Sequence, residues 1–132
     1  MAIDYGGKRI GIATSDSGIL ATPHSVVRNE GDIVAKLANL ALQLDATTII
    51  LGLPRRPNSQ GHEKKYRDLA EQLRQKTCKD VVLWDETLTT SEAAARLREA
   101  GRSRRDNGDI DMHAAAVILQ SYIDANPGGR PS

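Results

Sequence analysis

Three acidic residues, Asp4, Glu86 and Asp111, are spread over the whole sequence, yet each adjoins a segment with a strand or helix pattern. We expect these segments to bring the carboxylates to one crevice, where they would repel one another unless cations neutralise them. Hard oxygen ligands with incomplete protein coordination suit Mg²⁺ or Mn²⁺. Two such ions roughly 4 Å apart activate a water molecule and stabilise the leaving oxygen in phosphodiester hydrolysis. The three acids therefore indicate a divalent-metal-dependent nuclease in which they are the catalytic metal ligands.

Each acid also has an ordinary structural explanation. Asp4 can be the turn acid of a hairpin, Glu86 a loop acid ahead of a helix, and Asp111 a first-turn partner of a helix dipole. Taken one at a time, these explanations are the commoner ones. The independent placement of three acids at one edge of a predicted sheet is what favours a metal site.

The first strands form a predicted hairpin around Asp4. An apolar dipeptide runs into the acid, and the alternation of residues 10–14 predicts the returning strand. Gly6 and Gly7 lie at the reversal, where we expect them to supply positive φ angles. Residues 19–27 combine a proline with β-branched residues, which suits a third strand at the edge of the sheet.

Strands and helices alternate along the rest of the chain. The apolar runs at 47–54 and 81–84 predict two strands that pair in parallel with the first. The run at 47–54 is typical of a strand that is buried on both faces. Helical spacing predicts four helices, over residues 32–44, 62–76, 89–101 and 110–124. The result is an α/β fold with a mixed five-stranded sheet, three antiparallel meander strands plus two parallel strands, and helices on its faces. In such sheets the ligand crevice lies beyond the carboxyl ends of the parallel strands.

Local signals divide the chain further. Asn29 or Asp32 can cap the first helix, and Thr89 followed by Glu92 forms a capping box for the third. Residues 101–108 contain no apolar side chain and predict a mobile loop. We expect one nuclease domain over residues 1–125 and a disordered tail over residues 126–132.

The composition limits the functional class. The chain has 132 residues, enough for one core, and no apolar run approaches the roughly 20 residues of a membrane span. Cys78 is the one cysteine, and Met1 leads directly into a strand without a signal-peptide pattern, so we expect a soluble cytoplasmic protein. The net charge is +1, so contact with a nucleic acid requires local clusters of cations.

Cations do gather near the expected active edge. The candidates for contact with phosphates are Lys8, Arg9, Arg55, Arg56, Arg102, Arg104 and Arg105. Aromatic residues make up 3% of the chain and phenylalanine is absent, so surfaces for base stacking are scarce. We therefore expect binding of a polynucleotide that is mostly electrostatic, weakly sequence-specific and steeply dependent on salt.

Four motifs resemble those of the YqgF family, which comprises pre-16S rRNA nucleases and Holliday junction resolvase-like proteins related to RuvC. They are DYGGKRIGIATSD at 4–16, GLP at 52–54, DETLTT at 85–90 and DIDMHAAAVILQSYID at 109–124, in the order found in the family. The resemblance implies an RNase H-like fold, a divalent metal, and processing of the 5′ end of pre-16S rRNA. It assigns the catalytic carboxylates to Asp4, Glu86 and Asp111. Activity on Holliday junctions is suggested by more distant relatives.

The sequence departs from the family pattern in three places. Only three residues precede Asp4, and the loop after GLP carries two arginines where the family tends to have small or apolar residues. Resolvases of the wider superfamily often have a further acid where this chain has Ala114. Asp109, Asp85 or His113 would then have to complete a second metal site. His113 lies some 200° around a helix from Asp111, which disfavours ligation of the same ion.

Two other functional classes remain open. One is a nucleic-acid or ribosome-assembly binding protein of low activity. The other is a fragment of an actin-like phosphotransferase, because an acid-glycine hairpin also cradles nucleotide phosphates; the chain is too short for the second lobe that such enzymes need. The protein can be a monomer or a homodimer, and a junction resolvase requires the dimer because it cuts two strands symmetrically.

Overall fold

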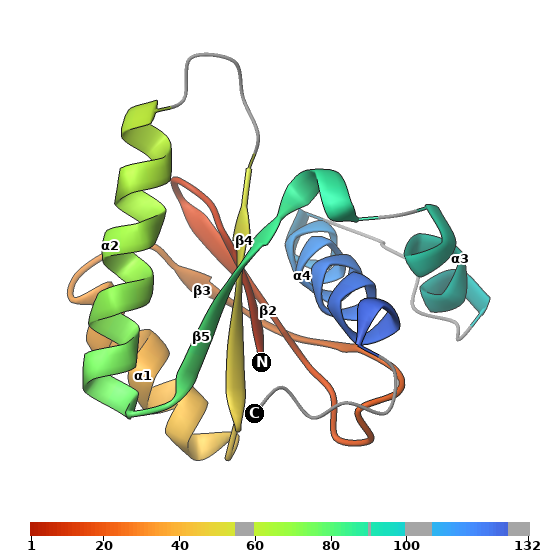
Figure 1. Cartoon of the computed structure of the whole chain (residues 1–132), viewed down its shortest axis with the longest axis horizontal. Coiled ribbons are helices and arrows are strands. Elements are labelled where there is room, and N and C mark those ends of the chain that lie inside the picture. Colours follow the sequence, from red (N-terminus) through yellow and green to blue (C-terminus); the bar gives the residue numbers. More distant parts are fainter. Residues whose placement is uncertain (55–59, 90, 100–106, 127–132) are drawn as a thin grey trace.

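The fold is known from a computed structural model that describes residues 1–54, 60–89, 91–99 and 107–126 (Figure 1). For residues 60–62, 96, 99 and 107–111 the description is confined to the backbone. Of the candidate cations, Arg55, Arg56, Arg102, Arg104 and Arg105 therefore lie outside the described residues, as does the predicted tail beyond residue 126. Within the described parts of the chain, no helix is long and apolar enough to cross a membrane.

Five strands form one mixed sheet. In chain order they are β1 (Ala2–Tyr5), β2 (Arg9–Thr14), β3 (Thr22–Arg28), β4 (Thr48–Leu53) and β5 (Asp80–Asp85). Their order across the sheet is β3-β2-β1-β4-β5, with β1 antiparallel to β2 and parallel to β4, and β5 parallel to β4. The predicted sheet of three meander strands and two parallel strands is confirmed, and Asp4 lies in its central strand.

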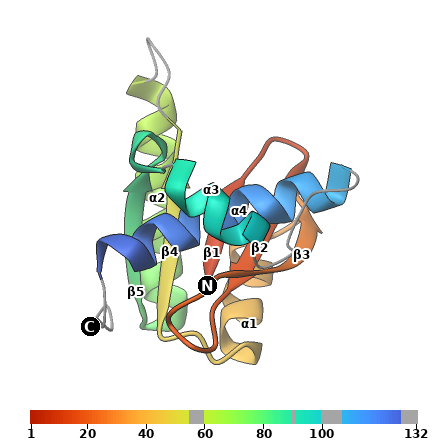
Figure 2. The same ribbon diagram turned by 90° about the vertical axis from the view of Figure 1, so that its right-hand side faces the viewer.

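Helices cover both faces of the sheet. They are α1 (Ile33–Gln43), α2 (Gln60–Thr77), α3 (Ser91–Glu99) and α4 (Asn107–Ala125), and the short 3₁₀ turn η1 (Glu86–Leu88) follows β5. The helices α1 and α2 pack together on one face, whereas α4 crosses β1 to β4 on the other and carries α3 on its outer side (Figures 1 and 2).

The alternation along the central strands divides the core into two clusters. Ile3 and Ile12 belong to the cluster under α1 and α2, whereas Ala2 and Ala13 belong to the cluster under α4. Consecutive strand residues point to opposite faces, so the parity of a position tells which helices it faces. By this rule Asp4 lies on the α4 face, together with Ala2.

The helix boundaries confirm some local signals and correct others. Asp32 is the N-cap of α1, and its carboxylate accepts a hydrogen bond from the Ala35 N–H at 3.2 Å. Thr89 does not begin α3; its N–H and hydroxyl both donate to the carbonyl of Glu86 and close η1 instead. The predicted loop is wrong in its last two residues, because α4 begins at Asn107.

The hairpin turn before β2 also differs from its prediction. Neither Gly6 nor Gly7 has a positive φ angle. Gly6 is required for a different reason: a Cβ atom at this position would lie 2.4 Å from the carbonyl oxygen of Arg9, which accepts the Gly6 N–H at 3.1 Å. The glycine therefore permits a close backbone approach and does not supply a special dihedral angle.

Candidate active site

Asp4 lies half-buried in β1, on the face of the sheet that α4 covers. Its partner across the antiparallel pair is Gly11 of β2. On the other side, β1 and β4 pair through Ile3 and Leu51, and the next position in that register brings Asp4 beside Gly52. Asp4 thus has a glycine on each neighbouring strand. No side chain projects from the directly opposite position in either strand, and the diagonal positions on β2 are Arg9 and Ala13.

Gly52, the first residue of the GLP motif, also leaves room for a side chain of α4. A Cβ atom at this position would lie 2.6 Å from Cδ1 of Ile118 in α4 and 3.6 Å from the carbonyl oxygen of Ile3. Real Cβ atoms do not approach other atoms so closely, so any larger residue at 52 would push the Ile118 side chain aside. The glycine therefore accommodates the Ile118 side chain in the row that contains Asp4.

Glu86 is exposed in η1, immediately after the carboxyl end of β5. The strand β4 separates β5 from β1, so the axes of β1 and β5 are about 10 Å apart. Asp85, the preceding acid, caps η1: its carboxylate accepts hydrogen bonds from the N–H of Thr87 at 2.9 Å and from its hydroxyl at 2.8 Å. These bonds use Asp85 to shape the turn that carries Glu86.

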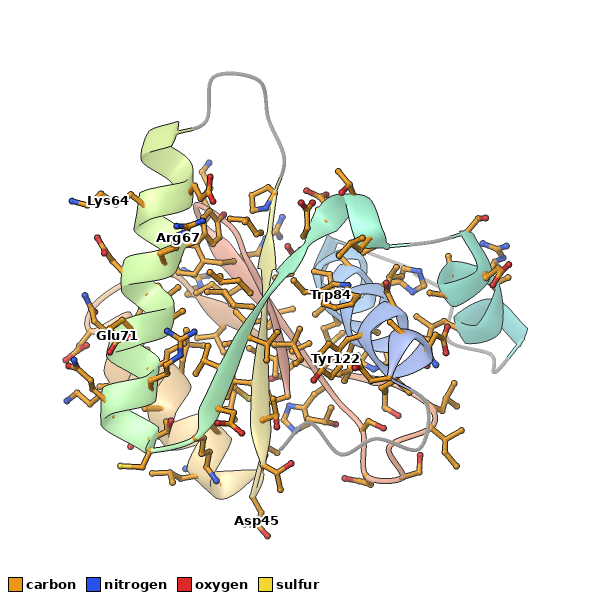
Figure 3. All side chains as sticks on the ribbon, in the orientation of Figure 1. Asp45, Lys64, Arg67, Glu71, Trp84 and Tyr122 are labelled. Atoms are coloured by element: carbon orange, nitrogen blue, oxygen red, sulfur yellow. The ribbon has the colours of Figure 1, made fainter. Side chains whose placement is uncertain are left out.

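A hydroxyl of α4 ties this turn to the helix. Ser121 donates to the carbonyl oxygen of Leu88, the last residue of η1, at 2.6 Å. The same hydroxyl accepts the indole N–H of Trp84 in β5 at 3.2 Å. Trp84 in turn packs edge-on against Tyr122, with ring centroids 5.2 Å apart (Figure 3). No local pattern in the sequence predicts this link, which fixes the position of η1 relative to α4.

Asp111 lies in the first turns of α4, and its side chain is outside the described residues. It precedes Ala115 and Ile118 by four and seven residues, the spacing of one helical face, and both of those residues are buried in the cluster under α4. His113 is half-buried two residues later. Among the side chains that the structure describes, no three from His, Cys, Asp and Glu gather closely enough to hold a metal ion. The described part of the site therefore contains two of the three predicted acids, one in β1 and one in the turn after β5, with β4 between these strands.

Two predicted phosphate-binding residues, Lys8 and Arg9, are exposed at the same edge of the sheet, where β1 turns into β2. A third cation was not predicted: Arg28, at the end of β3, is the direct cross-strand partner of Arg9 and is also exposed. The pairing of β2 with β3 was predicted, but its register, which sets Arg28 opposite Arg9, was not.

Residues 1–125 match the family described as RuvX, Holliday junction resolvase. The chain belongs to the RuvX family. Proteins named "Putative pre-16S rRNA nuclease" are its relatives. That of Anaeromyxobacter sp. (strain Fw109-5) is 41% identical over 131 residues, which cover 94% of this chain and 95% of the relative. That of Mycobacterium ulcerans (strain Agy99) is 42% identical over 142 residues, covering 98% and 82% of the two chains.

Solved structures agree with the RuvX assignment at the level of the fold. RuvC of Thermus thermophilus in complex with a Holliday junction substrate superimposes with a TM-score of 0.62 at 13% identity, over 95% of this chain and 94% of RuvC. Another T. thermophilus RuvC structure gives a TM-score of 0.61 at 14% identity, over 93% of each chain. The RNase H-like, RuvC-related fold implied by the sequence resemblance is thereby confirmed.

Proposed function

We propose that this RuvX-family chain is a divalent-metal-dependent nuclease that processes the 5′ end of pre-16S rRNA. The observation that carries the proposal is the position of Asp4: a carboxylate in the central strand, flanked by Gly11 and Gly52, under the helix that contains Asp111. Relatives that match nearly the whole chain have names that state this activity. A turn acid at the tip of a hairpin, the simplest alternative for Asp4, would not lie within the central strand.

The donor set fits Mg²⁺ or Mn²⁺. Asp4, Glu86 and Asp111 offer carboxylate oxygens and no sulfur or imidazole, as these hard cations prefer. Bound there, such ions would activate a water molecule and neutralise charge on the leaving oxygen. The chain itself contributes rigidity: Asp4 is held by two flanking strands, and Glu86 by a turn that Asp85 and Ser121 hold in place. Asp85 is a poor candidate for a fourth ligand because its carboxylate already caps η1.

Cleavage of branched DNA is a second candidate function. The specific observations in its favour are the match to a family described as Holliday junction resolvase and the superposition on RuvC bound to such a junction. This function would need a homodimer, because the two cuts are symmetric. A monomer in solution favours the RNA substrate. Either substrate places the protein with nucleic acids in the cytoplasm.

The test is a cleavage assay with Mn²⁺ on single-stranded pre-16S RNA and on a four-way DNA junction. We expect Asp4→Asn and Glu86→Gln to lower the cleavage rate about 100-fold or more, because each removes a charged metal ligand. Asp45→Asn is the matched control: the same chemical change at an exposed residue at the opposite end of the sheet, where it leaves the rate unchanged (Figure 3).

Equal cleavage by wild type, Asp4→Asn and Glu86→Gln would mean that the activity belongs to a contaminant. In that case a binding protein of low activity would be the better description. Cleavage of the junction alone, by a stable dimer, would replace the RNA substrate by DNA.

A further inference from the structure

The two arginines Arg9 and Arg28 face each other at the active edge of the sheet. They are Cα partners in the antiparallel pair β2–β3, and both side chains are exposed. Their neighbours Ile10 and Val27 pack on the cluster under α1 and α2. By alternation Arg9 and Arg28 therefore lie on the opposite face, which is the face of Asp4.

A β-bulge creates this pairing. The residues from Arg9 to Ile12 pair with those from Arg28 back to Ser25 in a single register. Between Ile12 and Ala13 the register shifts by one residue, so that Ala13 pairs with Pro23. Without the bulge, continuation of the register at Ala13 would set Val27 opposite Arg9 and turn Arg28 to the other face. Bulges beside active sites commonly re-aim side chains in this way. The bulge in this sheet places a second guanidinium on the Asp4 face.

Arg28 adds a second exposed cation to this end of the sheet. No acidic side chain that the structure describes forms an ion pair with Arg28. Guanidinium groups match phosphate oxygens in geometry as well as charge, so an exposed pair of arginines is suited to the phosphates of a bound strand.

The pair lies next to the proposed catalytic carboxylate. Asp4 is paired with Gly11, and Arg9 is two residues from Gly11 on the same face. Arg9 is therefore the diagonal neighbour of Asp4, a relation that corresponds to about 7–8 Å between residues. The residue of β2 directly opposite Asp4 is Gly11, which has no side chain. A strand of nucleic acid with its scissile bond at Asp4 can thus reach the arginines with an adjacent phosphate.

We propose that Arg9 and Arg28 form a phosphate-binding clamp for the substrate backbone on the β2–β3 side of Asp4. The clamp rests on the proposed nuclease function and adds the direction of the bound strand. The strand runs from the side of Glu86, across Asp4, toward the edge strand β3. Lys8, in the turn, contributes charge but does not define this direction.

Binding can be tested separately from cleavage, by fluorescence anisotropy with labelled single-stranded RNA and with duplex in EDTA. For Arg28→Gln we expect the slope of log affinity against log salt to decrease by about 0.7 for the single strand or about 0.9 for the duplex, the value of one phosphate contact. Arg28→Glu should weaken binding roughly tenfold or more at low salt. Lys76→Glu, which reverses an exposed charge in the last turn of α2, is the control for net charge and should leave the slope nearly unchanged.

Thermal stability separates binding from support of the fold. Arg28 is exposed, so without nucleic acid the melting temperature of Arg28→Gln should stay within about 2 °C of wild type while binding weakens. A residue that merely supports the fold would lose both properties together. Slopes and affinities equal to those of Lys76→Glu, or a fall in melting temperature alongside weaker binding, would overturn the clamp.

The two proposals can fail independently. If wild type cleaves RNA but the Arg28 variants bind and cleave like wild type, the clamp is wrong and the nuclease stands. If Arg28 variants lose binding but neither wild type nor Asp4→Asn cleaves any substrate, the clamp stands and the nuclease is wrong.

Discussion

The two faces of the sheet are built from side chains of very different size. Along the central strands β1 and β2, the face under α1 and α2 presents Ile3, Ile10 and Ile12, all fully buried. The other face of the same two strands presents Ala2, Gly11, Ala13 and the acid Asp4. Burial of each isoleucine stabilises the fold by about 1.5–3 kcal/mol, whereas the small residues contribute little apolar area.

The difference teaches how one sheet combines stability with a reactive site. The bulky face holds the strands in place, so the small face is free to accommodate a carboxylate in its centre. Small residues on that face leave room for the side chains of α4, as the contact between Gly52 and Ile118 shows. Substitutions on the first face should therefore act on stability, and substitutions on the second on the geometry of the site.

The largest effect on stability is expected on the bulky face. Leu51 in β4 is fully buried in the cluster under α1 and α2. Leu51→Ala should lower the free energy of unfolding by about 2–5 kcal/mol, because it removes buried methyl groups and leaves a cavity. Urea denaturation measures the loss. The cleavage rate per folded molecule should stay within about twofold of wild type, and a much larger fall would show that this face also shapes the site.

Met1 belongs to the cluster on the bulky face, and its buried amine makes the stability of the fold depend on pH. The terminal amine donates to the carbonyl oxygen of Thr48 at 2.9 Å, and its burial lowers the pKa from 8.0 to about 6. Below pH 6 the amine is protonated in both the folded and the unfolded chain, and above pH 8 it is protonated in neither. Between these values only the unfolded chain holds the proton, so the stability of a chain with a free amine at Met1 rises with pH, by about 3 kcal/mol in total.

The measurement for this rise is a series of denaturation curves from pH 5.5 to 8.5. The matched control is the same chain with an acetylated amine, in which the histidines still titrate but the amine does not. Parallel pH profiles of the two chains would contradict the assignment to Met1.

The sequence was sufficient for the topology because the decisive signals are local. The unbroken apolar run that ends at Leu53 marks a buried strand, and the hairpin before it places β1 beside β2. Asp4 could be placed in the central strand for the same reason. Its flanking glycines could not be assigned to it, because that requires the registers of two strand pairs.

Features that depend on contacts between distant segments were not predictable. The role of Gly6 follows from a carbonyl that approaches it across the turn, which a preference for positive φ does not describe. The pairing of Arg28 with Arg9 depends on a bulge, and a shift by one residue reverses the face of every following side chain. The link from Ser121 to η1 joins residues 33 positions apart in the chain.

A smaller effect is expected from the contact between α4 and the sheet. Gly52→Ala introduces a methyl group into the space of Ile118 Cδ1 and should cost about 1–3 kcal/mol of stability. It should also lower cleavage more than Leu51→Ala does per folded molecule, because the displaced Ile118 side chain packs on the face of Asp4. Ile118→Val removes the clashing atom, so the double variant should recover most of both properties. Additive losses in the double-mutant cycle would show that the two sites do not interact.

The smallest effect tests the link between α4 and Glu86. Ser121→Ala removes one hydrogen bond to Leu88 and one from Trp84, and should cost about 1–2 kcal/mol of stability. Because η1 is then less fixed, the Mn²⁺ concentration that gives half-maximal cleavage should rise several-fold. Trp84→Phe is the matched control: it loses the indole N–H but leaves the bond from Ser121 to Leu88 intact. If both variants shift the Mn²⁺ dependence equally, packing around Trp84 positions Glu86 and the Ser121 hydroxyl does not. If only Ser121→Ala shifts it, the small face controls the site through a single hydrogen bond from Ser121 to η1.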